Sequence, residues 1–202
     1  MRTAALFLVS LAGVALPEIA AAHLVSNRFG ELYSGILHPL TSLQHVVPWL
    51  GLGLLAGMLK SDASRWALAV FPLAVGVGTL TASFLPESDV VAAMNLASFI
   101  LLGALIAFAA RLPRPWFLGL AVIVGLSHGY ANGTRELEGG ALLLYVSGVV
   151  IAGYAVIALV SAVSHFVSRE MQWGSVAVRA VGSWIAAVGL VFGAYTVLTP
   201  AV

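Results

Sequence analysis

The chain has 202 residues, of which 61% are hydrophobic and 8% are charged, and its mean hydropathy is +1.05. Soluble domains average roughly 45–50% apolar and about 25% charged residues, so the composition excludes a soluble globular protein and indicates one surrounded by lipid bilayer. The net charge of +1, without a basic run, argues against nucleic acid as a partner. Because there is no cysteine, disulfides, thiolate metal sites and cysteine nucleophiles are excluded as well.

Residues 1–22 have the pattern of a secretory signal peptide. Arg2 supplies a positive charge, residues 4–16 form a short apolar stretch, and Ala20 and Ala22 fit a small-residue cleavage site. Cleavage after Ala22 leaves His23 as the first residue of a mature domain over residues 23–202. An uncleaved signal anchor is the alternative.

The remainder contains six apolar stretches, and crossing a bilayer takes roughly 20 residues of helix. We therefore predict an all-α membrane protein, a six-helix transmembrane bundle after the signal peptide. The expected spans are residues 36–58, 64–84, 90–110, 114–132, 140–164 and 175–198. Glycines four residues apart, at Gly53 and Gly57 and at Gly189 and Gly193, suit close helix packing within the chain, and a homo-oligomer or a membrane-complex partner is the alternative.

Positive charges predict the orientation, because Lys and Arg are enriched in the inner loops of membrane proteins. If the mature N-terminus lies outside, the outer segments hold only Arg28 and Arg135. The inner segments then hold a larger set: Lys60, Arg65, Arg111, Arg114 and Arg169. We therefore expect both termini outside.

Two histidines lie in the first expected span, where polar groups are costly and each is a candidate functional residue. His38 and His45 are seven residues apart, so an ideal helix puts them on one face but separates them by about 10 Å of rise. They cannot both bind one ion from such a helix. Pro39 and Pro48 could break or bend it, and a second helix could complete a site.

The fourth span ends in a second polar row. His128 and Asn132 are one turn apart, and Glu136 continues the row if the helix persists through Gly133. In the expected orientation this row lies in the outer half, as do the first-span histidines and His23. Because isolated polar groups in lipid are unfavourable and turn inward, we expect His38 and His45 to face His128 and Asn132.

Imidazole and carboxylate ligands suit Ni²⁺, Zn²⁺, Cu²⁺ and Fe²⁺. A free amino-terminal His23 would add an amine and an imidazole on one residue. We therefore predict a divalent-metal site in the outer half, whereas His165, in an inner loop without nearby ligands, is interpreted as an ordinary interfacial residue. Hydrogen bonding across helices is the alternative role for the intramembrane histidines.

Residues 125–129 match G-x-S-x-G, the nucleophile pattern of soluble hydrolases. That pattern needs a strand-to-helix turn, and here it lies in a transmembrane stretch, so we expect no enzyme. An intramembrane serine hydrolase, with Ser127 activated by a histidine such as His45, is a minor alternative. A helix-packing hydroxyl is the simpler interpretation of Ser127.

The two histidine segments resemble the HupE/UreJ family, small membrane proteins regarded as nickel or cobalt permeases linked to hydrogenase and urease maturation. The first family motif is H-P-x-x-G-x-D-H. His38, Pro39 and His45 match it, whereas Ser42 replaces its Gly and Gln44 replaces its Asp.

The second family motif is H-G-x-A-H-G-x-E. Four residues match it: His128, Gly129, Ala131 and Gly133. Asn132 replaces its second His and Arg135 replaces its Glu, with Glu136 one place later. Amides keep an oxygen acceptor but lose an anion or a strong nitrogen donor, so a divalent ion should bind more weakly than to the full motif.

The resemblance implies a protein of the bacterial inner membrane that binds or transports a divalent metal ion as its cargo, nickel first, with cobalt, zinc or copper as alternatives. The ligands so implied are His23, His38, Gln44, His45, His128, Asn132 and Glu136. There is no phosphate-binding loop, so any flux would be secondary or channel-like. A membrane accessory protein that keeps the scaffold without transport is the alternative.

Overall fold

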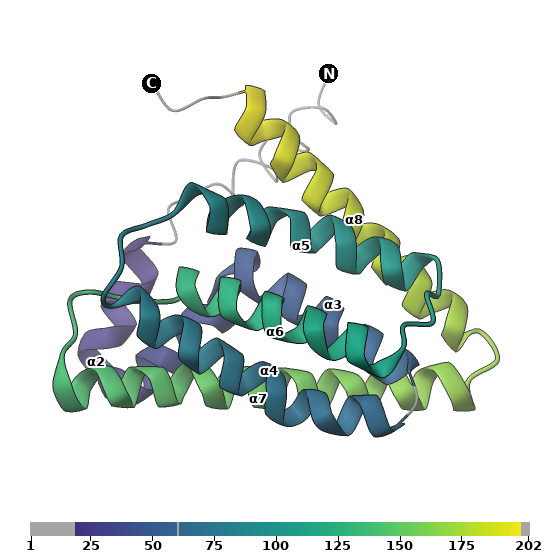
Figure 1. Cartoon of the computed structure of the whole chain (residues 1–202), viewed down its shortest axis with the longest axis horizontal. Coiled ribbons are helices and arrows are strands. Elements are labelled where there is room, and N and C mark those ends of the chain that lie inside the picture. The colour runs from purple at the N-terminus through teal and green to yellow at the C-terminus, as the bar shows by residue number, and fades with distance from the viewer. Residues whose placement is uncertain (1–18, 60, 199–202) are drawn as a thin grey trace, which may run out of the picture.

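The structure, a computed structural model, describes residues 19–59 and 61–198 (Figure 1). The regular elements in this part of the chain are all α-helices: α2 (Ile19–Thr41), α3 (Leu43–Met58), α4 (Ser61–Ala82), α5 (Asp89–Ala107), α6 (Arg114–Ala131), α7 (Gly139–Glu170) and α8 (Gly174–Leu198). Most of the expected signal peptide lies outside the described residues, so its cleavage stays a prediction.

The helices pack around α3, whose apolar side chains are the most completely enclosed. α7 packs against α2, α3 and α4, while α4 also lies along α6 and α5 pairs with α8 (Figure 1). Trp49 of α3 is fully buried and meets Phe71 of α4 edge to face, with ring centroids 5.4 Å apart. Such an aromatic pair adds about 0.5–1.5 kcal/mol beyond the burial of its area.

The outer surface of the bundle is apolar, as expected of helices that contact lipid. Large side chains such as Leu73, Leu143 and Leu190 are mostly exposed. Among the described residues four stretches are long and apolar enough to cross a membrane: Asp62–Ala82, Asp89–Ala107, Gly139–Glu170 and Gly174–Thr196. Because Leu43–Met58 is apolar but shorter, the count of six spans stays a prediction.

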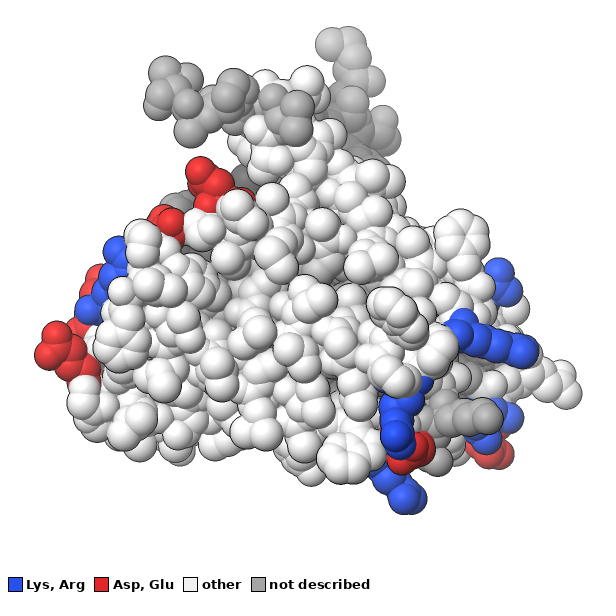
Figure 2. Space-filling view, viewed as in Figure 1, with Lys and Arg blue, Asp and Glu red and all other residues white. Residues whose placement is uncertain are grey.

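Charged residues gather at the two ends of the molecule and leave an uncharged band between them (Figure 2). Lys and Arg lie mostly at the end that carries the α5–α6 and α7–α8 connections. Acidic residues lie mostly at the other end, near the α4–α5 and α6–α7 connections. An uncharged band bounded by polar ends is the form that a bilayer imposes on a spanning protein.

The bounds of α4 to α8 lie near those of five expected spans, whereas residues 36–58 are divided between α2 and α3, an interruption that the two prolines left open. The helix is interrupted at Ser42, whose backbone is extended (φ −90°, ψ 115°), and the chain restarts as α3. Prolines lie inside the helices on both sides, Pro39 in α2 and Pro48 in α3. Each lacks an N–H and so removes one helical hydrogen bond, which weakens the helix around the break.

Glycines allow several helices to touch backbone to backbone. A Cβ on Gly129 of α6 would lie 2.1 Å from the carbonyl oxygen of Val75 in α4, and one on Gly57 of α3 would lie 2.5 Å from the carbonyl oxygen of Ser161 in α7. A Cβ on Gly189 of α8 would lie 2.5 Å from Cβ of Phe99 in α5. These glycine faces therefore pack helices of the same chain, and an oligomer stays a prediction.

Candidate functional site

The break at Ser42 brings His38 and His45 together. Their ring centroids are 5.9 Å apart, whereas an unbroken helix would separate them by about 10 Å along its axis. The two histidines lie on two helices separated by the break at Ser42, an interruption that Pro39 and Pro48 left open in the sequence.

His45 also meets His128 of α6, as expected from the sequence. Their Nδ1 atoms are 3.3 Å apart, and their rings are nearly perpendicular, with centroids 5.6 Å apart. His45 is 5% exposed and His128 is fully buried. Two imidazoles from different helices thus face each other inside the bundle with little access to water.

On its other side, His128 contacts a polar pair on α5. Its Nε2 lies 2.9 Å from Oγ of Ser98, and that hydroxyl donates a hydrogen bond to the backbone carbonyl of Asn95 at 2.6 Å. The side-chain Nδ2 of Asn95 donates to the carbonyl of Ser127 at 3.3 Å. These bonds connect α5 to α6 directly beside the histidine.

Asn132 caps α6 next to His128. Its Nδ2 donates to the backbone carbonyl of His128 at 2.7 Å, and its own backbone carbonyl accepts a hydrogen bond of 2.9 Å from the hydroxyl of Tyr145 in α7. The ring of Tyr145 lies 6.4 Å, between centroids, from that of His38. The contacts therefore lead from α6 through α7 back to α2.

These side chains form one group, which we call the polar cluster, drawn from α2, α3, α5, α6 and α7: His38, His45, Asn95, Ser98, His128, Asn132 and Tyr145. Its Asn95 and Asn132 each have a buried side-chain oxygen, Oδ1, without a hydrogen-bond partner. Both amides use their nitrogen to donate to a carbonyl, so the oxygen is the atom left over.

Three other expected ligands are not part of the polar cluster: two have exposed side chains, and the side chain of the third is not described. The side chain of Gln44 is exposed. Glu136 is also exposed. The helix does not persist through Gly133, the condition on which Glu136 would continue the row of His128, because α6 ends at Ala131 and Glu136 lies in the following loop. His23 belongs to α2, and the structure describes its backbone but not its side chain. Within the described part of the chain, no three His, Asp or Glu side chains are grouped as a metal site.

The sequence analysis missed the contribution of α5 and Tyr145. Asn95 and Ser98 are one turn apart in an otherwise apolar span, and both are buried. Polar residues at membrane depth are a general sign of a functional site, so this pair could have been found by that criterion. The tyrosine carries no such signal, because tyrosines are common at membrane interfaces.

The nucleophile-like pattern around Ser127 does not form a serine–histidine pair with the nearby imidazole. The hydroxyl of Ser127 donates to the carbonyl of Val124 in its own helix at 3.2 Å. The hydroxyl that contacts His128 belongs instead to Ser98. Ser127 therefore has the helix-packing role that the sequence favoured.

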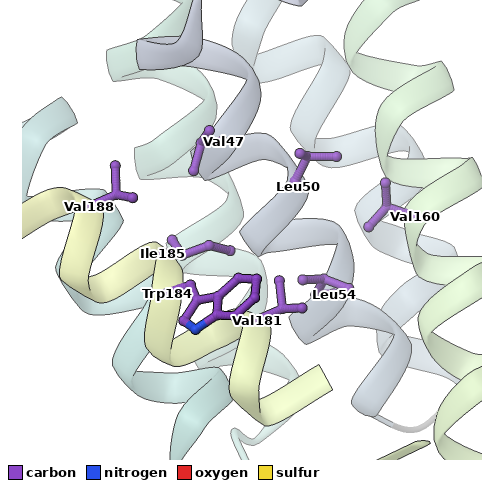
Figure 3. Close-up of a pocket in the computed structure, with 8 residues that line it drawn as sticks. All are labelled: Val47, Leu50, Leu54, Val160, Val181, Trp184, Ile185 and Val188. Carbon is purple, nitrogen blue, oxygen red and sulfur yellow. The ribbon is translucent and has the colours of Figure 1, made fainter. Parts of the chain in front are cut away.

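An apolar groove lies between α3, α7 and α8 (Figure 3). It has a volume of 360 Å³, and its lining is hydrophobic: Val47, Leu50, Leu54, Val160, Val181, Trp184, Ile185 and Val188. Such a lining supplies no ligand for a cation. The chemistry available for ion binding is therefore in the polar cluster.

Comparisons with known proteins agree with the family resemblance described for the sequence. The family model described as HupE / UreJ protein matches residues 10–192. A relative named Protein HupE, from Rhizobium leguminosarum bv. viciae, is 29% identical over 183 residues, which cover 89% of this chain and 93% of the relative. No solved structure matches the chain. With a family match across most of its length and a cluster built from both motifs, the chain belongs to the HupE/UreJ family.

Proposed function

We propose that this membrane protein binds a divalent metal ion in the polar cluster and passes it across the membrane, with nickel or cobalt as the first candidates. The observation that carries the proposal is the pair of buried imidazoles, His45 and His128, whose Nδ1 atoms face each other at 3.3 Å. Membership of the HupE/UreJ family supports a role in metal handling.

The distance between these nitrogens suits two ligands of one metal ion. Two imidazole nitrogens at about 2.0–2.1 Å from a tetrahedral metal are roughly 3.3–3.4 Å apart. Without metal, a single proton between the same two atoms makes a long hydrogen bond. Exchange of this weak bond for two metal–nitrogen bonds would require little movement of either helix.

The remaining ligands would be neutral oxygens. The Oδ1 atoms of Asn95 and Asn132 are buried without hydrogen-bond partners, whereas His38 lies beside His45 but does not complete a group of three metal-ligating side chains in the described chain. Neutral ligands leave the charge of the ion uncompensated in a medium of low dielectric constant, so affinity should be modest. A modest affinity favours passage over storage, because an ion must leave the site as readily as it enters.

The ion would enter from the acidic end of the bundle. Glu136 and Glu138 are exposed in the α6–α7 connection, at this end of the bundle. Acidic residues at an entrance raise the local concentration of cations. With the Arg-rich end inside, the acidic end faces outward and both termini lie outside the inner membrane.

A membrane accessory protein without transport is the second candidate. The observation that favours it is the lack of a carboxylate beside the paired histidines: within the described residues, no group of three His, Asp or Glu forms. In that case the cluster would hold the five helices together by hydrogen bonds and ring contacts, without a metal.

Metal uptake by proteoliposomes that contain a Ni²⁺-sensitive dye tests the proposal. The wild-type protein should carry Ni²⁺, whereas His45→Asn and His128→Asn should each reduce the rate at least about tenfold, because each removes one of the paired ligands. His165→Asn is the matched control and should keep the rate, because the structure places His165 within α7, not in the expected inner loop, and outside the polar cluster. Binding in calorimetry without uptake would establish the accessory role, and neither binding nor uptake would contradict metal handling.

A further inference from the structure

The hydroxyl of Ser98 has one proton, and its hydrogen bonds show where that proton goes. Ser98 Oγ donates to the backbone carbonyl of Asn95 at 2.6 Å, and a carbonyl oxygen can only accept. The same Oγ lies 2.9 Å from Nε2 of His128. Since its proton is already used, Oγ must accept there, and Nε2 of His128 must carry the hydrogen.

The hydrogen on Nε2 determines that the other ring nitrogen of His128, Nδ1, carries no hydrogen. A neutral imidazole has one N–H, so the Nδ1 of His128 is left with a lone pair. That lone pair faces Nδ1 of His45 at 3.3 Å. In the metal-free protein His45 must therefore donate from its Nδ1. For a metal ion to bind there, that proton would move to Nε2 of His45, so that the ring stays neutral and its Nδ1 lone pair becomes available.

We propose that Ser98 is a positioning residue, which holds His128 as the Nε2–H tautomer and so turns the lone pair of Nδ1 toward His45. A ligand histidine usually donates its second N–H to an oxygen, which fixes its tautomer and ring orientation. The metal part of this inference rests on the proposed function, but the tautomer does not depend on a metal.

Burial makes the hydroxyl difficult to replace by water. Ser98 is 4% exposed and Asn95 is 8% exposed. Asn95 further holds α5 against α6 through its bond to the carbonyl of Ser127, so Ser98 stays opposite the imidazole. A helix of otherwise apolar composition thereby takes part in the site through two polar residues.

Nitrogen-15 NMR of the metal-free protein in detergent micelles tests the tautomer directly, because protonated and unprotonated ring nitrogens resonate at well-separated shifts. The wild-type spectrum should show His128 with hydrogen on Nε2. Ser98→Ala should produce a mixture of the two tautomers, and Ser98→Thr, which keeps the hydroxyl, should restore the Nε2–H form. Ser127→Ala removes an equally buried hydroxyl on the neighbouring helix and should leave the spectrum of His128 unchanged.

Ni²⁺ titration of the same variants tests the consequence for binding. Ser98→Ala should weaken binding by about 10- to 100-fold, as loss of the oxygen partner of a ligand histidine does, while Ser98→Thr and Ser127→Ala should stay close to wild type. Hydrogen on Nδ1 of His128 in the wild-type protein, or an unchanged tautomer in Ser98→Ala, would overturn the inference. If the tautomer responds as expected but the wild-type protein binds no metal, the positioning role holds and the proposed function fails.

Discussion

Asn132 stands inside the polar cluster at a position where the family motif has histidine. Its Nδ2 donates to the carbonyl of His128, and its Oδ1 has no partner. The reverse orientation of the amide would place two acceptor oxygens against each other. The hydrogen bond therefore determines which side-chain atom of Asn132 has no hydrogen-bond partner. That atom is an oxygen, which suits a cation.

Asn132→Asp replaces the donating nitrogen by a second oxygen beside the carbonyl of His128. We expect the metal-free variant to unfold at a lower temperature, since loss of this buried hydrogen bond costs about 1–3 kcal/mol. Ni²⁺ should raise the unfolding temperature of the variant more than that of the wild type, because a carboxylate compensates the charge of the ion and a bound ligand stabilises the folded state. Thermal unfolding in detergent, with and without Ni²⁺, measures both effects.

Gln172→Glu is the matched control, an exposed amide-to-carboxylate change at the other end of the bundle. It should alter neither the unfolding temperature nor its response to Ni²⁺. Equal responses of the two variants would mean that Asn132 does not face a metal site.

Between elements, the pairing of α4 with α6 determines where His128 lies. A Cβ on Gly129 would approach the Val75 carbonyl oxygen to 2.1 Å, and one on Gly78 would approach the Leu126 carbonyl oxygen to 2.3 Å. The two helices are therefore in backbone contact on both sides of the His128 turn. Close approach of this kind stabilises membrane helices through van der Waals packing.

The same glycine-to-alanine change at two positions of α6 should have opposite effects. Gly129→Ala forces the helices apart, so we expect destabilisation of about 1–3 kcal/mol, as in overpacked cores. Gly119→Ala has open space around its Cβ and should stabilise by up to about 1 kcal/mol through helix propensity. The free energy of unfolding in detergent, measured for both variants, tests this. Equal effects of the two substitutions would contradict the backbone contact at Gly129.

Hydropathy was sufficient to predict most of the helices, because a bilayer requires long apolar stretches with hydrogen-bonded backbones. Pro39 and Pro48 left a break in the first span open, but nothing in the sequence specified Ser42 as the residue at which the helix opens. The proximity of His45 and His128 was expected, because polar groups in lipid turn inward. The role of Ser98 depends on hydrogen-bond geometry, which no spacing in the sequence specifies.

For the whole molecule, the separation of charge between the ends makes orientation a testable property (Figure 2). The α6–α7 connection lies at the acidic end and the α7–α8 connection at the end that carries most Lys and Arg. By the positive-inside rule we expect the second connection to lie in the cytoplasm. The lack of cysteine in the natural chain allows each connection to be labelled separately.

Single cysteines at two exposed loop positions should report this orientation. Glu136→Cys should react with a membrane-impermeant maleimide in intact spheroplasts, whereas Gln172→Cys should react only after the membrane is permeabilised. Labelling is measured by the mass added to the purified protein. The reverse pattern would invert the topology, and labelling of both in intact spheroplasts would place both connections on the outside.

The neutral side chains of the polar cluster have a consequence for energetics. No carboxylate in the described chain joins the paired histidines, so an ion held there keeps both of its positive charges. A membrane potential acts on each charge with about 2.3 kcal/mol per 100 mV, which amounts to about 4.6 kcal/mol for a divalent ion that crosses the whole field. Fixed side chains do not cross with the ion, so passage of the ion alone would be electrogenic, and a potential negative inside would drive its accumulation without hydrolysis of a nucleotide. Within the described chain, the polar cluster adds no carboxylate that would hold the ion back against this potential.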